Sequence, residues 1–484
     1  MSEFKLPNER DARVRSRAYR SEIVRDPVVL SEEQKILGNG LIYHVSTYGC
    51  QANVRDGEVI CGILEEMGFT STEDLAQADL IILNTCAIRE NAENKVVGEL
   101  GFLQAYKRRN PRLIVGVCGC MAQEEKMARK IVDRYPVVDL MFGTHNIYRL
   151  PALLENIIRN DQRSIEVLSE QGRIYEGLPT IRTSRHKAFV NIMDGCDKFC
   201  TYCIVPYTRG QQRSRLKDDV IRECRQLIDS GYREITLIGQ NVNAYGKDLD
   251  EGYDFATLLN EVADLGIERL RFTTSHPWDF TDAMIDAIAD RENIMPFIHL
   301  PLQSGNDEIL KLMGRRYTRE QYLALYDRIV SRVSEVAVST DIIVGFPNET
   351  SQQFLDTLSV VDYCRYDNAY SFIYSPREST PAARMADSTP MEEKKERLAI
   401  LNQKLGEYSK MRNKAWENRV CDVLVDGFSK TDRTVMSGYT RQQKLVNFRS
   451  GKARVGDIID VRITEGMKNS LNGIDISEER AENE

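Results

Sequence analysis

Hydrophobic and polar positions follow a βα rhythm from residue 39 onwards. Short apolar runs typical of buried strands occupy residues 41–47, 79–85, 113–119 and 137–143. Between them apolar residues recur at helical spacing, as in 58–68 and in a segment that ends near residue 159. Strands that alternate with helices predict a parallel sheet covered on both faces.

A second βα series extends from residue 187 to about residue 385. Its expected strands are residues 187–193, 233–239, 269–274, 296–302, 336–346 and 369–375. Six strand–helix units predict a partial (β/α) barrel, because a complete barrel has eight. Residues 390–417 have the pattern of one long charged helix, which we interpret as a connector.

Three other segments lack this rhythm. Residues 1–38 are polar and carry six arginines, so we expect a flexible, solvated extension rather than a binding arm. Residues 160–186 are polar and mixed, which is typical of a linker. Residues 418–478 are short β-rich segments separated by turn residues, which predicts a small β-barrel.

Composition places the chain among ordinary globular proteins. Its 484 residues are 42% hydrophobic and 29% charged, which suggests about three domains. No apolar run has the length of a membrane span, and we find no signal-peptide pattern. We therefore expect a cytoplasmic protein that has no membrane association and whose 11 cysteines are reduced.

Charge is distributed unevenly along the chain. The net charge of -8 argues against wholesale coating of nucleic acid. Residues 430–454 nevertheless contain seven basic residues and one acidic residue, with Tyr439 and Phe448 between them. The basic residues are Lys430, Arg433, Arg441, Lys444, Arg449, Lys452 and Arg454. Basic barrels with stacking aromatics suit single-stranded nucleic acid, so we favour RNA contact over an ordinary solvated face.

The run GCDKFCTYC contains the most informative cysteines, Cys196, Cys200 and Cys203. Iron–sulfur clusters normally take four cysteines, so a CxxxCxxC loop leaves one iron of a four-iron cluster open to a small molecule. The alternative is a zinc knuckle, but zinc needs four ligands and no fourth Cys or His lies nearby. The spacing therefore favours a cluster.

A second set of cysteines follows the first three predicted strands. Cys50, Cys86 and Cys120 each lie just after a strand, where loops of a parallel sheet converge on one edge. Glycines beside Cys50 and Cys120 allow close backbone approach. Small buried apolar residues are the alternative interpretation, but the shared loop position favours a metal site. Cys118 lies on the strand side and is expected to point into the core.

An ordered series of motifs carries a family resemblance. TYGCQAN, NTCAIRENAENK, GCMAQ, IMDGCDKFCTYCIVPYTRG, RFTTSHP, HLPLQSG and DIIVGFPNET resemble the methylthiotransferases of the radical S-adenosylmethionine (SAM) superfamily. The resemblance covers about residues 39–478. It implies a methylthiotransferase N-terminal domain at 39–155, a linker at 156–181, a radical SAM domain at 182–412 and an RNA-binding TRAM domain at 413–480.

The resemblance also implies the cofactors and their residues. Cys196, Cys200 and Cys203 would hold a SAM-reducing 4Fe-4S cluster, and Cys50, Cys86 and Cys120 an auxiliary 4Fe-4S cluster. SAM would lie at the carboxyl ends of the barrel strands. The residues implied near it are Gly239, Gln240, Ser275, Gln303, Ser304 and Asp341.

The implied reaction is methylthiolation of a dimethylallyl-modified adenosine at position 37, beside the tRNA anticodon. The sequence TYGCQ favours tRNA over a ribosomal protein as the substrate. A tRNA that carries threonylcarbamoyladenosine is a second alternative substrate for the same reaction. A noncatalytic zinc-containing RNA-binding protein is the alternative of another class. The expected partners are the tRNA anticodon stem-loop and a reductant such as flavodoxin or ferredoxin. We expect a monomer, and the sulfur donor is left open.

Two details remain open in the sequence. Ala52 and Asn348 stand where the family usually has Met and Gly, and Asn tolerates the left-handed backbone conformation. A basic stretch follows the cluster loop. It could bind a phosphate or a carboxylate, and an ordinary solvent-exposed segment is an equally good interpretation. Its members are Arg209, Arg213, Arg215 and Lys217.

Overall fold

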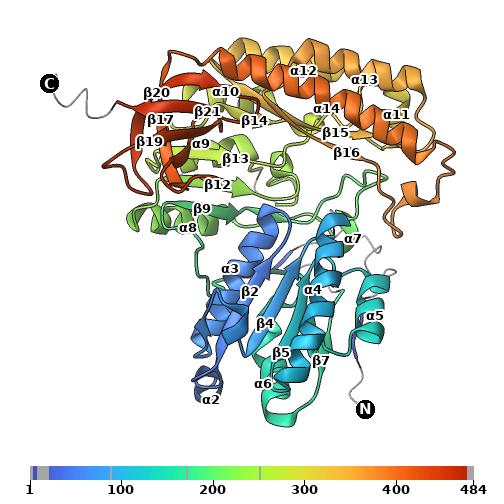
Figure 1. Cartoon of the computed structure of the whole chain (residues 1–484), viewed down its shortest axis with the longest axis vertical. Coiled ribbons are helices and arrows are strands. Elements are labelled where there is room, and N and C mark those ends of the chain that lie inside the picture. The colour runs from blue at the N-terminus through green and yellow to red at the C-terminus, as the bar shows by residue number, and fades with distance from the viewer. Residues whose placement is uncertain (1–3, 8–20, 88–89, 170–172, 250–251, 477–484) are drawn as a thin grey trace.

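The computed structural model describes residues 4–7, 21–87, 90–169, 173–249 and 252–476, and no side chain is described for 90–94. An N-terminal sheet domain lies below a central domain, and a small barrel packs against one end of the central domain (Figure 1). Within the described part of the chain, no helix is long and apolar enough to cross a membrane.

The N-terminal domain is a six-stranded parallel sheet in the order β3-β2-β4-β5-β6-β7. Its strands are β2 (Ile42–Thr47), β3 (Thr70–Ser71), β4 (Leu80–Thr85), β5 (Ile114–Gly119), β6 (Leu140–Phe142) and β7 (Ser164–Glu166). One face packs against α3 (Gln51–Glu66) and α6 (Leu150–Asn160), and the other against α4 (Glu90–Arg109) and α5 (Glu125–Arg134). The prediction of a parallel sheet covered on both faces is confirmed.

Two segments predicted to lack regular structure form strands instead. The predicted linker contributes β7 to the sheet, and it also contains β8 (Arg173–Glu176). Strand β8 pairs in parallel with β1 (Glu22–Arg25), which lies in the predicted flexible extension and precedes the short helix α2 (Glu32–Lys35). Residues 8–20, with most of the arginines of that extension, lie outside the described residues.

Strands β1 and β8 lack a clear apolar pattern because ion pairs hold them in place. Arg25 of β1 bonds Asp219 of the central domain at 2.8 and 3.0 Å, and Glu176 of β8 bonds Arg215 at 2.6 and 2.7 Å. The β1–β8 ribbon is therefore held by charged side chains that lie far from it in sequence.

The central domain is an open barrel made of two three-stranded parallel sheets, β13-β12-β9 and β14-β15-β16. The strands are β9 (Lys187–Asn191), β12 (Glu234–Ile238), β13 (Arg269–Phe272), β14 (Phe297–His299), β15 (Ala337–Val344) and β16 (Asn368–Ile373). The two sheets meet at β13 and β14, where the Met295 N–H donates to the Leu270 carbonyl at 2.7 Å. Strands β9 and β16 are thus the outer edges of the open barrel. This agrees with the prediction of a partial barrel made of six strands.

Helices cover the outside of this barrel (Figure 1). They are α8 (Lys217–Asp229), α9 (Phe255–Ala263), α10 (Asp282–Asp290), α11 (Asp307–Leu312), α12 (Arg319–Arg332), α13 (Ser351–Cys364) and the long α14 (Met391–Lys414). Alternate strand residues such as Val190, Leu237 and Ile342 pack into the core under these helices. Because strand residues alternate between faces, their neighbours, including Asp341 and Tyr370, line the inner face.

The C-terminal segment is a closed five-stranded barrel in the order β17-β18-β19-β21-β20. Its strands are β17 (Val420–Phe428), β18 (Met436–Thr440), β19 (Leu445–Arg449), β20 (Ile458–Gly466) and β21 (Leu471–Asp475). Its contacts to the central domain are polar. The fully buried Arg269 of β13 donates to the Tyr439 carbonyl at 2.7 Å and to Asp422 at 3.0 Å.

Candidate active site

The three N-terminal cysteines converge at the carboxyl edge of the sheet. Cys50 immediately precedes α3, and Cys86 and Cys120 follow β4 and β5. The amide oxygen of Asn53 lies 3.3 Å from the Cys50 sulfur and 4.0 Å from the Cys120 sulfur. A hydrogen bond from Cys86, together with the nearby Arg209 charge, lowers the pKa of Cys50 to about 6 against the effect of burial. The structure therefore brings the predicted set together.

Gly49 makes this convergence possible. Its φ is 128°, and a Cβ atom built there would lie only 2.2 Å from the Cys86 Cβ and 3.2 Å from its sulfur. Any side chain at this position would displace Cys86. Cys118 lies in the apolar core of the sheet, as expected.

The CxxxCxxC loop follows β9 and the short strand β10 (Met193–Asp194), which pairs with β11 (Arg213–Ser214). Cys200 is buried, and Cys196 and Cys203 are partly buried. Burial raises the pKa of Cys196 to about 12, and the pKa of Cys203 is raised by burial and by the neighbouring thiols. The three thiols are thus largely withdrawn from solvent.

Residues just after this loop connect the two cysteine sets. Ile204, next to Cys203, is buried in a small apolar cluster with Ala87 and Cys120. The Cys196 N–H donates to the Gly210 carbonyl at 3.2 Å, and the neighbouring Arg209 donates from Nε to the Cys120 sulfur at 3.3 Å. The segment 204–210, which begins with helix α7 (Val205–Thr208), thus touches both sets.

Each cysteine set has one buried arginine beside a sulfur. Arg209 is 5% exposed and also bonds Asp56 at 2.5 Å, and Arg315 is 4% exposed with Nη1 3.6 Å from the Cys200 sulfur. Both positive charges favour thiolates, and hydrogen bonds to cluster sulfurs tune iron–sulfur sites. Sequence reasoning missed Arg315 and gave Arg209 no such role.

The chemistry of the donor sets is compatible with four-iron clusters. Within the described ranges, no three His, Cys, Asp or Glu side chains are grouped as a single metal ion would require. A four-iron cluster holds its thiolates farther apart than a zinc ion does. Three thiols per set, with no fourth cysteine between them, leave one coordination position for another ligand.

The predicted SAM contacts divide into three groups. Ser275 and Gln303 are buried at the ends of β13 and β14, and neither the Ser275 hydroxyl nor the Gln303 side-chain carbonyl has a partner among the described residues. Asp341 lies on the inner face of β15, partly exposed, with His299 Nε2 at 3.2 Å. Buried polar groups normally have partners, so this part of the site fits a polar ligand.

The other three have structural contacts. The Gln240 side chain accepts from the Gly195 N–H at 2.5 Å, and a Cβ at Gly239 would lie 2.5 Å from Met193 Cγ. Ser304 is fully buried and lies 3.4 Å from the Thr357 hydroxyl of α13. Gln240 and Gly239 thus contact the segment that leads into the CxxxCxxC loop, and Ser304 contacts α13.

Other inner-face residues were missed by sequence reasoning. Asn241 has an unpartnered side-chain carbonyl among the described residues, and its amide donates to Asp279 at 2.8 Å. Burial, with the nearby Arg315 charge, lowers the pKa of His276 to about 2, so its imidazole is neutral. His276 and His299 belong to the RFTTSHP and HLPLQSG motifs. A histidine at or near the end of a predicted strand could therefore have identified them as residues of the site.

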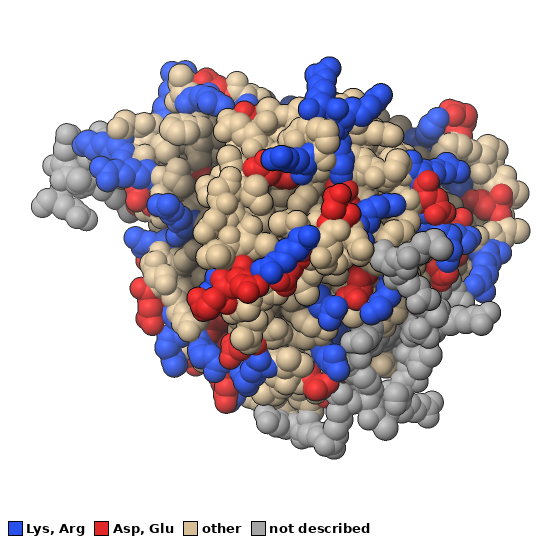
Figure 2. Space-filling model, turned by 90° about the horizontal axis from the view of Figure 1, so that it is seen from below, with Lys and Arg blue, Asp and Glu red and all other residues tan. Residues whose placement is uncertain are grey.

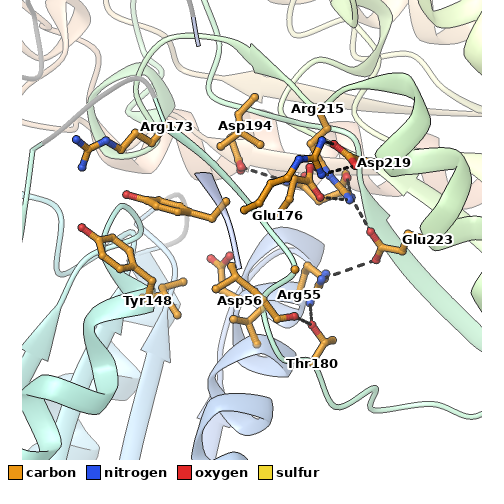
Figure 3. A pocket seen from close by; sticks show the side chains of 18 of the residues that line it. Arg55, Asp56, Tyr148, Arg173, Glu176, Thr180, Asp194, Arg215, Asp219 and Glu223 are labelled. Atoms are coloured by element: carbon orange, nitrogen blue, oxygen red, sulfur yellow. Dashed lines mark hydrogen bonds and ion pairs between the residues drawn. The ribbon is translucent and has the colours of Figure 1, made fainter. Parts of the chain in front are cut away.

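A cavity of about 540 Å³ lies beside the cysteines, between the N-terminal and central domains (Figure 3). Among its described lining residues none is a predicted cysteine or SAM contact. Its charged residues are mostly paired: Arg215 bonds Glu176 and Glu223, and Arg209 bonds Asp56. Arg215 and Arg209 are thus interdomain ion pairs, Lys217 lies 3.6 Å from Glu261, and Arg213 is buried in the cavity wall.

The predicted RNA-binding residues of the C-terminal barrel need correction. Arg441 bonds Asp422 within the barrel at 3.1 Å and donates to the Glu292 and Glu268 carbonyls of the central domain. Lys444 is buried between Asp367 and Asn413, so both basic residues help to join the barrel to the rest of the molecule. Phe448 is 1% exposed inside the barrel, and Tyr439 packs against Lys187 at 5.8 Å. The basic residues that remain exposed are Lys430, Arg433, Arg449, Lys452 and Arg454.

Surface charge is mixed on the face shown in Figure 2, where Lys and Arg side chains are interspersed with Asp and Glu.

Comparisons with known proteins define the class. Residues 42–143 match the model of the uncharacterized protein family UPF0004, 190–361 the radical SAM superfamily and 414–474 the TRAM domain. The radical SAM methyltransferase TsrM from Kitasatospora setae aligns with a TM-score of 0.53 at 15% identity, covering 71% of this chain and 77% of that chain. This likeness shows the fold. The open barrel and its CxxxCxxC loop therefore define a radical SAM enzyme with a TRAM domain.

Two curated relatives identify the family. The tRNA-2-methylthio-N(6)-dimethylallyladenosine synthase of Staphylococcus saprophyticus is 50% identical over 98% of this chain and 92% of its own length. The Staphylococcus aureus protein of the same name is 52% identical over 93% of this chain and 88% of its own length. The chain belongs to the tRNA-2-methylthio-N(6)-dimethylallyladenosine synthase family.

Proposed function

We propose that this enzyme adds a methylthio group to C2 of N6-(dimethylallyl)adenosine at position 37 of tRNA. The observation that supports this most is the contact between the two cysteine sets through residues 204–210, where Ile204 packs on Cys120 and Gly210 accepts from Cys196. Replacing a ring C–H by sulfur has no acid–base route, so a cofactor must supply radical chemistry. A sulfur-carrying site must then lie beside the radical source, and this arrangement provides one.

We assign two 4Fe-4S clusters and SAM as cofactors. Cys196, Cys200 and Cys203 would hold the cluster that reduces SAM, and Cys50, Cys86 and Cys120 the auxiliary cluster. When bound, the first cluster and SAM supply a radical able to take hydrogen from an unactivated carbon. The unpartnered carbonyls of Gln303 and Asn241 suit the amino group of SAM, because carbonyl oxygens accept from an ammonium.

The chain's own residues orient these groups. Arg315 and Arg209 place a buried positive charge beside one sulfur of each set, which offsets the negative charge of three thiolates. The inner-face aromatics Tyr370 and Phe372, 49% and 41% exposed at the open edge of β16, are suited to stack a flipped base. The target adenine would therefore enter through the gap between β9 and β16.

The partners follow from this chemistry. The anticodon stem-loop of tRNA would contact the exposed basic residues of the C-terminal barrel, and a reductant such as flavodoxin or ferredoxin would supply electrons. We infer that the enzyme acts as a monomer in the cytoplasm.

Nucleoside mass spectrometry tests the substrate. In cells that lack the gene, 2-methylthio-N6-dimethylallyladenosine should disappear from tRNA and the unmethylthiolated nucleoside should accumulate, and the wild-type gene should reverse both changes. Undiminished methylthiolation of that nucleoside, with loss of a threonylcarbamoyl or ribosomal-protein product, would assign the enzyme to the other substrate. A colourless anaerobic preparation with stoichiometric zinc would overturn the catalytic proposal altogether.

A further inference from the structure

The CxxxCxxC loop reaches the surface of the molecule at Phe199. This residue is 39% exposed and has a φ of 50°, which is unusual for a bulky side chain. It immediately precedes Cys200, which is only 8% exposed. The loop therefore presents an aromatic ring to solvent one residue away from a buried predicted cluster ligand.

Two more exposed apolar side chains surround this point. Trp278 is 46% exposed and Leu312 is 46% exposed. The cluster loop is fastened beside Leu312, because Thr201 donates from its N–H to the Met313 carbonyl at 2.9 Å and from its hydroxyl to the Leu312 carbonyl at 2.7 Å. Phe199, Trp278 and Leu312 thus come from three separate segments, namely the cluster loop, the turn that follows β13 and the end of α11.

Positive charges border these apolar side chains. Lys198 Nζ and Arg316 Cζ each lie 5.6 Å from the centre of the Trp278 ring. Lys198 and Lys247 each lie 2.6 Å from Asp279, whose carboxylate is fully buried beneath them. Lys311 and Arg316 are exposed, and Asp197 is the acidic residue of the loop itself. We call these apolar and cationic residues together the Trp278 patch.

Part of the Trp278 patch lies at the seam of the open barrel, away from the proposed entry route of the substrate. Trp278 follows β13, and Leu312 and Arg316 follow β14, so these three residues lie near the seam where the two half-barrel sheets meet. The CxxxCxxC loop reaches them through Lys198 and Thr201. The gap between β9 and β16 lies on the other side of the open barrel. An RNA base that enters through that gap would approach the inner face, whereas Phe199, Trp278 and Leu312 are exposed to solvent.

We propose that the Trp278 patch is the docking surface for an acidic one-electron carrier protein. The proposal rests on the proposed function, because a cluster that reduces SAM must itself be reduced in every cycle. In the step, the carrier loses one electron and the cluster held by Cys196, Cys200 and Cys203 gains one, and no bond, proton or group is exchanged. Electron transfer falls steeply with distance, and at this surface the carrier would be separated from Cys200 by little more than Phe199.

The composition of the Trp278 patch fits such an encounter. Electron-transfer complexes use small interfaces, below roughly 1,200 Å², and gain their rate from charge complementarity rather than from area. Tryptophan and arginine are the side chains that most often anchor an interface. A compact aromatic centre with a cationic border therefore selects a small acidic partner.

Charge reversal of exposed residues tests the proposal in the intact holoenzyme. The variant Lys311→Glu/Arg316→Glu would be compared with wild type for the rate of cluster reduction, followed by loss of visible absorbance under anaerobic conditions. The two donors would be a purified reduced bacterial flavodoxin and the small reductant dithionite. We expect reduction by flavodoxin to slow by about tenfold or more at low salt, and reduction by dithionite to stay within about twofold of wild type.

A matched control reverses the same amount of charge elsewhere. Lys130→Glu/Lys410→Glu changes exposed lysines on α5 and α14, which are not part of the Trp278 patch, and should leave both rates near those of wild type. Trp278→Ala should slow reduction by flavodoxin without changing the salt dependence, because it removes the aromatic anchor and no charge.

Three outcomes would overturn the proposal. The first is an unchanged flavodoxin rate in the Lys311→Glu/Arg316→Glu variant. The second is equal slowing with dithionite, which would mean that the variant damages the cluster. The third is weaker binding of a labelled anticodon stem-loop with a normal flavodoxin rate, which would make the Trp278 patch an RNA contact. Failure of the proposed radical chemistry is distinguishable, since wild-type protein would then contain no reducible iron–sulfur cluster, and a different methylthiolation substrate would leave the reduction assay unaffected.

Discussion

Arg209 Nε lies 3.3 Å from the sulfur of Cys120, although the two residues belong to different domains. The same guanidinium bonds Asp56 on α3, and Arg209 is adjacent to Gly210, whose carbonyl accepts from Cys196. One dipeptide therefore contacts both cysteine sets. Buried arginines with several fixed hydrogen bonds hold geometry well, because the planar guanidinium is rigid.

Arg209→Gln should impair the auxiliary site more than the rest of the molecule. The change removes a positive charge and the donor to Cys120, and partners of this kind typically contribute 10- to 100-fold to metal affinity or activity. We expect about tenfold faster loss of iron to a chelator in a background where Cys196, Cys200 and Cys203 are Ala. Electron paramagnetic resonance of the remaining cluster should also shift.

Arg209→Lys is the matched comparison, since it keeps the charge but cannot bond Cys120 and Asp56 together. Intermediate iron loss in this variant would assign part of the effect to charge. If Arg209→Gln retained iron as wild type does and gave the same spectrum, the contact with Cys120 would have no role in holding the cluster.

Much of this site could be predicted because it depends on local rules. Cysteines after successive parallel strands must lie on one edge, and the structure brings Cys50, Cys86 and Cys120 together there. Asn348, at a position where Gly is usual, has a φ of 60°, as the left-handed tolerance of Asn allows. Local backbone chemistry was sufficient in both cases.

Long-range polar contacts could not be predicted from one sequence. Arg441 and Lys444 have the pattern of a nucleic-acid surface, yet they bond Asp422 and Asp367. A charge pattern shows how many positive charges a segment carries, but not which acidic residues the fold places beside them. The β1–β8 ribbon was missed for the same reason, since Arg25 and Arg215 find their partners across domains.

Removal of each cysteine set should remove half of the iron. Wild-type protein purified without oxygen should be brown and contain about eight irons, from two four-iron clusters. We expect about four irons in the Cys196→Ala/Cys200→Ala/Cys203→Ala variant and about four in the Cys50→Ala/Cys86→Ala/Cys120→Ala variant. Iron and sulfide analysis checks both. A single variant that lost all iron would show that the two sets do not bind clusters independently.

The exposed basic residues of the C-terminal barrel should contribute to RNA binding, whereas the buried ones should not do so directly. Phe428 is 59% exposed, and it lies next to the loop that carries Lys430 and Arg433. Hydrogen bonds from Thr434 lower the pKa of Asp432 in this loop, and the charge of Arg449 lowers it further. Arg449 therefore lies close to the same loop. Arg433→Ala and Arg449→Ala should each reduce the salt dependence of anticodon stem-loop binding by about one ion.

Arg441→Ala provides the contrast within the same barrel. It should lower the unfolding temperature, since it breaks contacts with Asp422 and the Glu292 carbonyl, and leave the salt dependence of RNA binding unchanged. Equal salt dependence in all three variants and wild type would place the RNA elsewhere on the molecule.

Tyr370 should be important for the substrate base. Its ring lies 6.2 Å from His299 on the inner face, beside Asp341. Stacking of a base on an aromatic side chain contributes about 1–3 kcal/mol, so Tyr370→Ala should raise the KM for tRNA by roughly 5- to 150-fold. Tyr363→Ala removes an equally exposed tyrosine from the outer helix α13 and should leave KM unchanged. Equal effects of the two substitutions would exclude a specific stacking role.

Asp426 should make the attachment of the C-terminal barrel sensitive to acid. Burial opposes its ionisation, but hydrogen bonds from His186 and Lys187 lower the pKa of Asp426 to about 2. Because the folded pKa lies below the unfolded value of about 3.9, the pairing stabilises the protein above about pH 4 and loses its effect as the pH falls towards 2. Asp426→Asn should therefore cost roughly 2 kcal/mol at pH 7 and progressively less between pH 4 and pH 2. Hydrogen exchange of the barrel strands measures this, and a difference from wild type that did not shrink in acid would mean that the carboxylate charge is not what holds the barrel.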